Sequence, residues 1–406
     1  MLGRDLLCKG VYLLGRFTSA EKFMFCTIFM FLTLFCYYYI FFLGYDGLDW
    51  CDFITQRAVC EQTIKGTEVY LLRGDSETIY MGFHAIPWGC ILGNIFYPAF
   101  LSVEAGKIYF LTLNITVLII CSYVLYRKIK PVSYDLGLLA AVMSVLSVDF
   151  LFSIYMGNGG AVVCMFMLIA WAVCDEHPIF AGVLTGLAMI KPQTAALMCL
   201  TMLLMKRVKP LIVGAVIDVA AWFIVSVMTK RGMFELISEF LFSSDKLSDS
   251  FQAGIFTLAF NNGLIAMACS MLLGIIFVLM LHICIPENLP QYFKIYPAML
   301  AANFWCYGNF TDSYILIIPA VICLWLITFQ SSSSKRFMWF SLSLWCSYGP
   351  IIRSVLRRFL YLIYKPLPDD AVFSIYIPRT IHEVGLLVIG ILICLELRKT
   401  YSEVRS

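Results

Sequence analysis

The sequence predicts an all-α polytopic membrane protein, and its composition is the first reason. Of the 406 residues, 61% are hydrophobic and only 14% are charged, and the mean hydropathy is +0.86. A soluble domain carries roughly 25% charged residues, and its single core would be too small for this apolar excess. A lipid bilayer accommodates the excess, and an α-helix crosses a bilayer with its backbone hydrogen bonds satisfied internally.

The second reason is the length of the apolar runs. A helix needs roughly 20 apolar residues to cross the hydrocarbon, and the runs predict about 10–12 crossings. The stretch 178–205 is interrupted at Lys191-Pro192-Gln193, where proline breaks a helix, so we expect two short helices in a hairpin. The other expected crossings are 23–43, 107–126, 135–153, 160–174, 210–228, 263–284, 292–308, 314–329, 336–350 and 380–397.

Short basic loops predict the orientation. In this arrangement the four clusters fall on one side, and basic loops are retained on the cytoplasmic side of a membrane. We therefore expect a multi-pass protein of the cell membrane, with both termini cytoplasmic and the long loops facing the periplasm or the extracellular side. The clusters are Arg127-Lys128, Lys206-Arg207, Lys335-Arg336 and Arg398-Lys399.

The long outward loops divide the chain into two modules. We expect residues 1–210 to form a membrane module whose first outer loop, 45–103, carries the chemistry. Residues 211–406 form a C-terminal transmembrane module with outer loops 229–262 and 351–380. The end of the first loop, from His84, is apolar but broken by two prolines, and we expect it to dip into the outer leaflet without crossing. Apolar positions at helical spacing in the second loop indicate a helix on the membrane surface.

Two groups of residues suggest chemistry at the outer face. Asp46, Asp49 and Asp52 follow the first membrane helix directly, so their carboxylates are expected at the outer interface. A carboxylate there can take the proton of an attacking hydroxyl, although loop acids are also commonly just solvated. Lys191 lies between apolar runs, where an ionisable residue is costly and is a functional candidate. The alternative is a lysine that extends to the interface at a helix end.

Three segments, in this order, resemble the polyprenyl-phosphate-mannose-dependent glycosyltransferases of family 87. The first is Cys51-Asp52-Phe53 with Arg57-Ala58, Gly66 and Tyr70. The second is Tyr155-Met156-Gly157-Asn158, and the third runs from Ala181 through Gly186 to Lys191-Pro192-Gln193. The resemblance covers roughly residues 20–330, and it implies a GT-C type membrane fold with outward-facing interfacial helices.

The resemblance also implies the roles of individual residues. It makes Asp52 the catalytic base and Lys191 a phosphate contact, while Arg57 either braces the loop or contacts the donor. The expected substrate-binding residues at the outer face further include Asp46, Asn158 and Asp312. The family's donor is a sugar on a polyprenyl monophosphate, its transfer inverts the anomeric centre, and it needs no metal and no other cofactor. The acceptor would be a lipid or a glycan.

One departure from the family concerns Asp312. Many members carry a histidine directly after this acid, whereas this chain has Ser313. The difference leaves open which sugar and which acceptor are used, including whether the sugar is mannose. It does not remove the proposed base.

Arg353 and Arg357 are candidates from spacing alone. They lie one helical turn apart, so a helix would point both the same way, and two arginines on one face suit a phosphate. Anchoring to anionic lipid headgroups is the alternative.

Other functions remain as alternatives. A secondary transporter or lipid flippase would be expected to show paired broken helices, but only one broken segment is evident, at Lys191-Pro192. A polysaccharide polymerase or ligase would centre its chemistry on a large late loop, whereas the acid-rich loop here follows the first helix. The expected partners are therefore a polyprenyl-phosphate sugar, a lipid or glycan acceptor and membrane lipids. The net charge of +3 gives no reason to expect nucleic acid.

Overall fold

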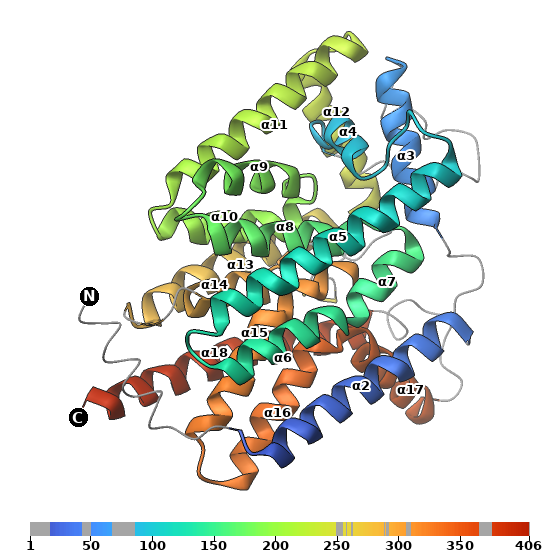
Figure 1. Cartoon of the computed structure of the whole chain (residues 1–406). Helices are drawn as coiled ribbons and strands as arrows, with labels where there is room; N and C mark the ends of the chain where they lie inside the picture. Colours follow the sequence, from blue (N-terminus) through green and yellow to red (C-terminus); the bar gives the residue numbers. More distant parts are fainter. Residues whose placement is uncertain are drawn as a thin grey trace.

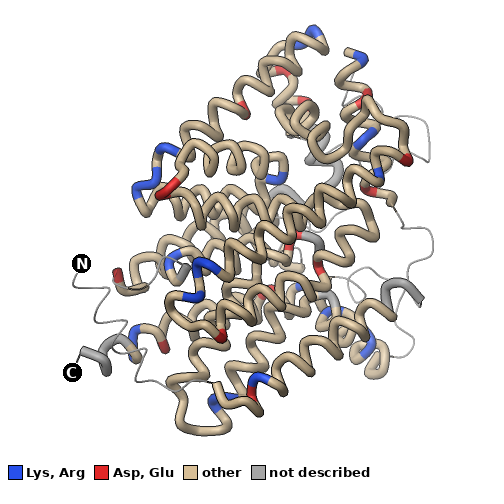
Figure 2. Tube along the Cα trace, viewed as in Figure 1, with Lys and Arg blue, Asp and Glu red and all other residues tan. Residues whose placement is uncertain are grey.

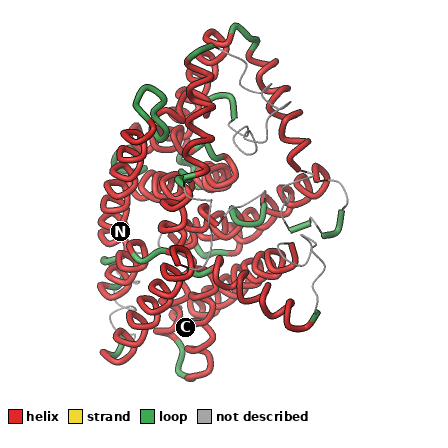
Figure 3. The backbone as a smooth tube through the Cα atoms, turned by 90° about the vertical axis from the view of Figure 1, so that its right-hand side faces the viewer, coloured by secondary structure: helices red, strands yellow, loops and turns green. Residues whose placement is uncertain are grey.

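The computed structural model describes residues 17–42, 50–66, 86–248, 255–256, 258–260, 263–287, 289, 292–305, 310–364 and 376–405. Within these residues the regular elements are all helices (Figures 1 and 3). They are α2 (Ser19–Phe42), α3 (Cys51–Ile64), α4 (Gly89–Leu92), η1 (Gly93–Ile95), α5 (Val103–Ile129), α6 (Tyr134–Val145), α7 (Val148–Met156), α8 (Gly160–Val173), α9 (Pro178–Ala188), α10 (Pro192–Leu204), α11 (Val208–Thr229), α12 (Met233–Ser248), α13 (Gly263–Cys284), α14 (Tyr292–Ala301), η2 (Phe310–Leu316), α15 (Ile317–Leu326), η3 (Ile327–Phe329), α16 (Ser333–Ser347), α17 (Gly349–Ile363) and α18 (Ile377–Arg405).

The described helices confirm the prediction of a polytopic all-α membrane protein. Seven of them are long and apolar enough to cross a membrane, counting α6 with α7 and η2 with α15 and η3 as one span each. They are Ser19–Tyr38, Val103–Ile129, Tyr134–Met156, Val208–Thr229, Ile265–Cys284, Asp312–Phe329 and Ile377–Thr400.

The five remaining expected crossings are shorter helices. α8, α9, α10, α14 and α16 contain 14, 11, 13, 10 and 15 residues. At about 1.5 Å per residue they reach about 15 to 23 Å, which is less than the hydrocarbon thickness of about 30 Å. The hairpin of two short helices is present as α9 and α10, and the helix break falls at Lys191 as expected.

Two helices that are apolar on every side form the centre of the molecule. All residues of α15 and all but the last of α8 are buried, as expected for helices without a polar face. α8 packs against α5, α9, α10 and η2, while α15 packs against α6, α14 and α16. Helices from both halves of the chain therefore share one core.

Ion pairs gather several helix ends at one end of the molecule, which we call the basic end. They connect the start of α2 with α6 and α16, and the loop after α8 with the end of α5 and the start of α11. The pairs are Lys22–Asp135, Arg336–Glu21, Lys128–Glu176 and Arg207–Asp175. In Figure 2 these helix ends lie at the left and lower left.

At the opposite end of the molecule, the long and the short helices end at different levels. α9 packs along α11 and α8 packs along α5, all extending from the basic end. α5 and α11 have 27 and 22 residues, or about 40 and 33 Å, whereas α8 to α10 reach only about 17 to 21 Å. The far tip of the α9–α10 hairpin, which contains Lys191, is thus recessed below the far end of α11 (Figure 1).

The outer segments extend past this recess. The segment expected to dip without crossing contains α4 and η1, which have only four and three residues and are too short to cross. α4 packs against α3 and α11. The helix expected in the second outer loop is present as α12, which packs against α11 and α13.

Candidate functional site

A glycine turn brings the start of α3 against the start of α8. Gly157 ends α7 with φ +68°, in the left-handed region that favours glycine. A Cβ on Gly157 would lie only 2.4 Å from Cβ of Phe53. The backbone N–H of Trp50 donates to the carbonyl oxygen of Tyr155 at 3.0 Å. The first turn of α3, which contains Asp52, therefore lies directly beside Asn158.

Asn158 connects Asp52 to Lys191. Its Nδ2 donates to Oδ2 of Asp52 at 2.6 Å, and its Oδ1 accepts from Nζ of Lys191 at 2.6 Å and from the backbone N–H of Gly160 at 2.7 Å. The flipped amide would place its NH₂ against two donors and its oxygen against a carboxylate. The orientation of the Asn158 amide is therefore determined by its neighbours.

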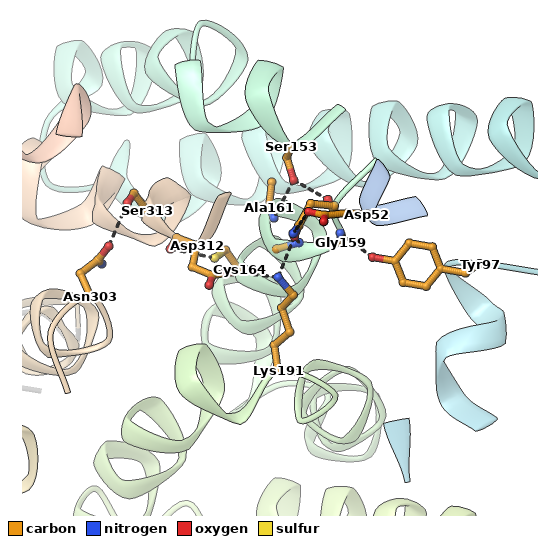
Figure 4. Close-up of polar contacts among 12 residues, drawn as sticks. Asp52, Tyr97, Ser153, Gly159, Ala161, Cys164, Lys191, Asn303, Asp312 and Ser313 are labelled. Carbon is orange, nitrogen blue, oxygen red and sulfur yellow. Dashed lines mark hydrogen bonds and ion pairs between the residues drawn. The ribbon is translucent and has the colours of Figure 1, made fainter. Parts of the chain in front are cut away.

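Lys191 also pairs with a buried acid. Its Nζ lies 3.3 Å from Oδ1 of Asp312, whose side chain is only 2% exposed, compared with 17% for Lys191. A carboxylate buried to this degree needs a charged partner, and the ammonium provides one. Contacts thus join Asp52, Asn158, Lys191 and Asp312 in that order, and we call these four residues the polar row. Figure 4 shows the tip of Lys191 between Asp52 and Asp312.

Buried hydrogen bonds fix the turn that carries Asn158 of the polar row. Ser153 Oγ donates to the carbonyl oxygen of Asn158. The backbone N–H of Gly159 donates to the hydroxyl of Tyr97 at 2.6 Å. Burial raises the pKa of the Tyr97 hydroxyl well above its ordinary value, and Asp52 adds to this effect, so the hydroxyl stays protonated at neutral pH. The turn at 157–160 is thus fixed on several sides.

Two features of the polar row leave capacity for a ligand. Oδ2 of Asp52 accepts from Asn158, whereas the described contact of Oδ1 is a long one of 3.9 Å with the thiol of Cys51. Asp52 is half-buried and Lys191 is partly exposed. An ammonium has three N–H donors, and the contacts with Asn158 and Asp312 use two. The polar row can accept a proton at Asp52 and donate to an anion at Lys191.

The other predicted site residues lie in different places. Arg57 braces α3 against the following segment, because Nη2 donates to the carbonyl oxygens of Leu101 at 2.8 Å and Ala99 at 3.3 Å, and Nη1 pairs with Glu61. Asp46 lies outside the described residues. Neither position tests a contact with substrate.

The two arginines of α17 do not share an environment. Arg353 is buried and its Nη2 contacts Nδ1 of His382 at 3.3 Å, whereas Arg357 is exposed. They differ because nearly every residue after position 356 in α17 is exposed, so the helix leaves the body of the protein after its first turns. Neither arginine has a described contact with the polar row, and their phosphate role stays a prediction.

Sequence reasoning missed two buried groups close to this site. Tyr97 acts through a contact with a turn 62 positions away, and no local pattern indicates it. Asp149 is buried within the expected crossing 135–153, where an ionisable residue was itself a signal. Among the residues that the structure describes, no three His, Cys, Asp or Glu side chains are grouped closely enough to hold a metal ion.

Comparison with known protein families gives a match over most of the chain. The family model of glycosyltransferase family 87 matches residues 94–347, which is more than half of the chain. The matched region contains Asn158, Lys191 and Asp312, whereas Asp52 precedes it. No curated protein and no solved structure matches the chain.

Proposed function

The chain belongs to glycosyltransferase family 87 and is a membrane glycosyltransferase, and we propose that it transfers a sugar from a polyprenyl-phosphate donor to a lipid or glycan acceptor. Mannose is the first candidate for the sugar, because the family resembled uses it. The observation that carries the proposal is the polar row, in which a carboxylate that can still accept a proton lies two contacts away from an ammonium.

The polar row suits each bond change of such a transfer. The hydroxyl oxygen of the acceptor attacks the anomeric carbon, and Oδ1 of Asp52 takes the hydroxyl proton. The bond between the anomeric carbon and the phosphate oxygen breaks, and the electron pair leaves with the phosphate. The lipid phosphate thereby gains a negative charge, which Lys191 stabilises. Attack opposite the leaving phosphate inverts the anomeric centre.

Asn158 and Asp312 have distinct positions in this scheme. Asn158 holds Asp52 and Lys191 at a set distance, so the base and the phosphate contact act on one substrate. Asp312 neutralises part of the Lys191 charge before the donor binds. When the phosphate gains its second negative charge, the ammonium can strengthen its hydrogen bond to that oxygen. This interaction is stronger in the transition state than in the ground state, which is what lowers a barrier.

The position of Lys191 suits a donor held by a lipid. A polyprenyl chain keeps its phosphate near headgroup depth, and the tip of the α9–α10 hairpin that contains Lys191 stops short of the far end of α11. Basic loops are retained in the cytoplasm, so the basic end supports a cytoplasmic location for both termini. The polar row then faces the periplasm or the extracellular side.

The test is a transfer assay in proteoliposomes. Polyprenyl-phosphate mannose and polyprenyl-phosphate glucose are supplied with lipid and glycan acceptors, and a nucleotide sugar serves as the control donor. Vesicles are sorted by whether an external reagent labels a cysteine introduced at position 61 (Glu61→Cys) in a variant whose native cysteines are replaced by serine. We expect transfer only from a polyprenyl donor in the leaflet on the side where position 61 is labelled. Transfer from the nucleotide sugar alone would contradict the proposal.

A further inference from the structure

The turn that carries Lys191 is a break between two short helices. α9 ends at Ala188 and α10 begins at Pro192, so the carbonyl oxygens at the end of α9 have no following turn of the same helix to pair with. In a membrane protein, backbone groups freed by such a break need partners from neighbouring segments. Two tryptophans from distant parts of the chain donate to this backbone, one on each side of Lys191.

The first tryptophan belongs to the outer segment that contains α4. Nε1 of Trp88 donates to the carbonyl oxygen of Met189 at 3.0 Å, two positions before Lys191. Met189 caps the C-terminal end of α9, so this bond satisfies a carbonyl that the helix break exposes. The residue after Trp88 also packs on the turn, because a Cβ on Gly89 would lie 3.7 Å from Cβ of Ile190.

The second tryptophan comes from the C-terminal half of the chain. Nε1 of Trp305 donates to the carbonyl oxygen of Gln193, two positions after Lys191. Trp305 is buried and packs closely on Gly274 of α13, where a Cβ would collide with its side chain. The indole is therefore fixed between α13 and the start of α10.

The backbone at Lys191 determines where its ammonium lies. The N–H of Lys191 donates to the carbonyl oxygen of Ala188 at 3.1 Å, and its carbonyl oxygen accepts from the N–H of Thr194 at 3.0 Å. From this turn, Nζ contacts Oδ1 of Asn158 at 2.6 Å and Oδ1 of Asp312 at 3.3 Å. A shift of the turn would lengthen both contacts, and hydrogen bonds weaken steeply as their geometry degrades.

We propose that Trp88 and Trp305 form an indole clamp that positions Lys191 for the donor phosphate. Both are positioning residues, which act through the backbone of the turn and contact no substrate. Their effect on donor binding rests on the phosphate contact proposed for Lys191, whereas the clamp itself can be tested without substrate.

The kinetic test uses Trp88→Phe and Trp305→Phe, which keep an aromatic ring and remove the N–H donor. We expect each to raise the donor KM by about 3- to 10-fold, as for the loss of one neutral hydrogen bond. The acceptor KM should stay within about twofold of the wild type, since the turn contacts the donor alone.

Trp222→Phe is the matched control. Nε1 of Trp222 also donates to a backbone carbonyl oxygen, that of Met233 at 3.1 Å, which lies outside the Lys191 turn. The phenylalanine keeps a ring against Trp88, whose ring centroid lies 6.2 Å from that of Trp222. The donor KM of this variant should stay within about twofold of the wild type.

A variant cycle tests whether the clamp acts through Lys191. In a Lys191→Met/Asp312→Asn background no ammonium remains to be positioned, so adding Trp88→Phe should leave the donor KM of that background unchanged. An equal rise in the donor KM with and without Lys191 would overturn the proposal, because the indole would then act on the donor directly.

Hydrogen–deuterium exchange in detergent tests the clamp without substrate. We expect the amides of the turn, at positions 189 to 191, to exchange faster in Trp88→Phe and Trp305→Phe, while α5 keeps its wild-type rates. Trp222→Phe should leave the turn at its wild-type rates. Unchanged exchange of the turn in both clamp variants would overturn the proposal. If the wild type transfers no sugar from a polyprenyl donor, the proposed function fails, while the exchange rates still decide on the clamp.

Discussion

Asp52→Asn is expected to lower kcat by about 10²- to 10⁴-fold, the contribution typical of a positioned general base. The amide has the shape of the carboxylate, and its oxygen can still accept from Nδ2 of Asn158, as Oδ2 of Asp52 does at 2.6 Å. The substituted side chain cannot take a proton from the acceptor hydroxyl. The loss should therefore appear in kcat with the donor KM little changed, measured as initial rates of transfer in proteoliposomes.

A second carboxylate provides the control for Asp52→Asn. Glu104 lies in the first turn of α5 near the same end of the molecule, and its side chain is 79% exposed and pairs with Lys107. Glu104→Gln removes a similar charge without touching the polar row, and its kcat should stay within about twofold of the wild type. Full activity in Asp52→Asn would show that another group takes the proton.

Lys191→Met is expected to raise the donor KM by about 10- to 100-fold, because hydrogen bonds to charged groups contribute about 1.5–3 kcal/mol. The methionine side chain fills similar space but offers no donor to the phosphate. A decrease in kcat should accompany the change, since the phosphate oxygen gains charge as its bond to the sugar breaks. The measurement is transfer rate against the concentration of polyprenyl-phosphate sugar.

The Lys191 result has to be separated from a folding defect. Lys191→Met leaves the buried carboxylate of Asp312 without the cation that lies 3.3 Å from it, which can cost about 3–5 kcal/mol of stability. Adding Asp312→Asn removes that charge as well. We expect the double variant to regain the melting temperature of the wild type while its donor KM stays high. A donor KM that returns to the wild-type value would assign Lys191 a purely structural role.

Composition and local pattern were sufficient for the fold class and for several elements. The hairpin of α9 and α10 was predictable because Lys191-Pro192 ends one apolar run and starts the next. The lengths of α8 and α14 were not, because an apolar run reads the same whether lipid or protein covers it. Only the packing decides which apolar faces of the long helices are covered by protein. For example, only 17% of the apolar stretch of Val208–Thr229 is buried inside the protein, compared with 89% for Asp312–Phe329.

For the candidate site, the sequence indicated residue types but not contacts. Asp52, Asn158, Lys191 and Asp312 were all candidates, yet their contacts span 106, 33 and 121 positions. Nothing in the separate segments shows that Asn158 connects a base to an ammonium. Arg353 and Arg357 show the opposite case, because their spacing on one helix does not reveal that α17 leaves the protein body between them.

The most direct test of a donor at the polar row is a structure with a bound polyprenyl-phosphate sugar, or with its non-hydrolysable phosphonate analogue. We expect one phosphate oxygen within about 3 Å of Lys191 Nζ, as for a charge-assisted hydrogen bond. We also expect the face of the anomeric carbon opposite the phosphate to point toward Oδ1 of Asp52. A phosphate bound instead at the basic end, near Lys128 and Arg207, would contradict the account.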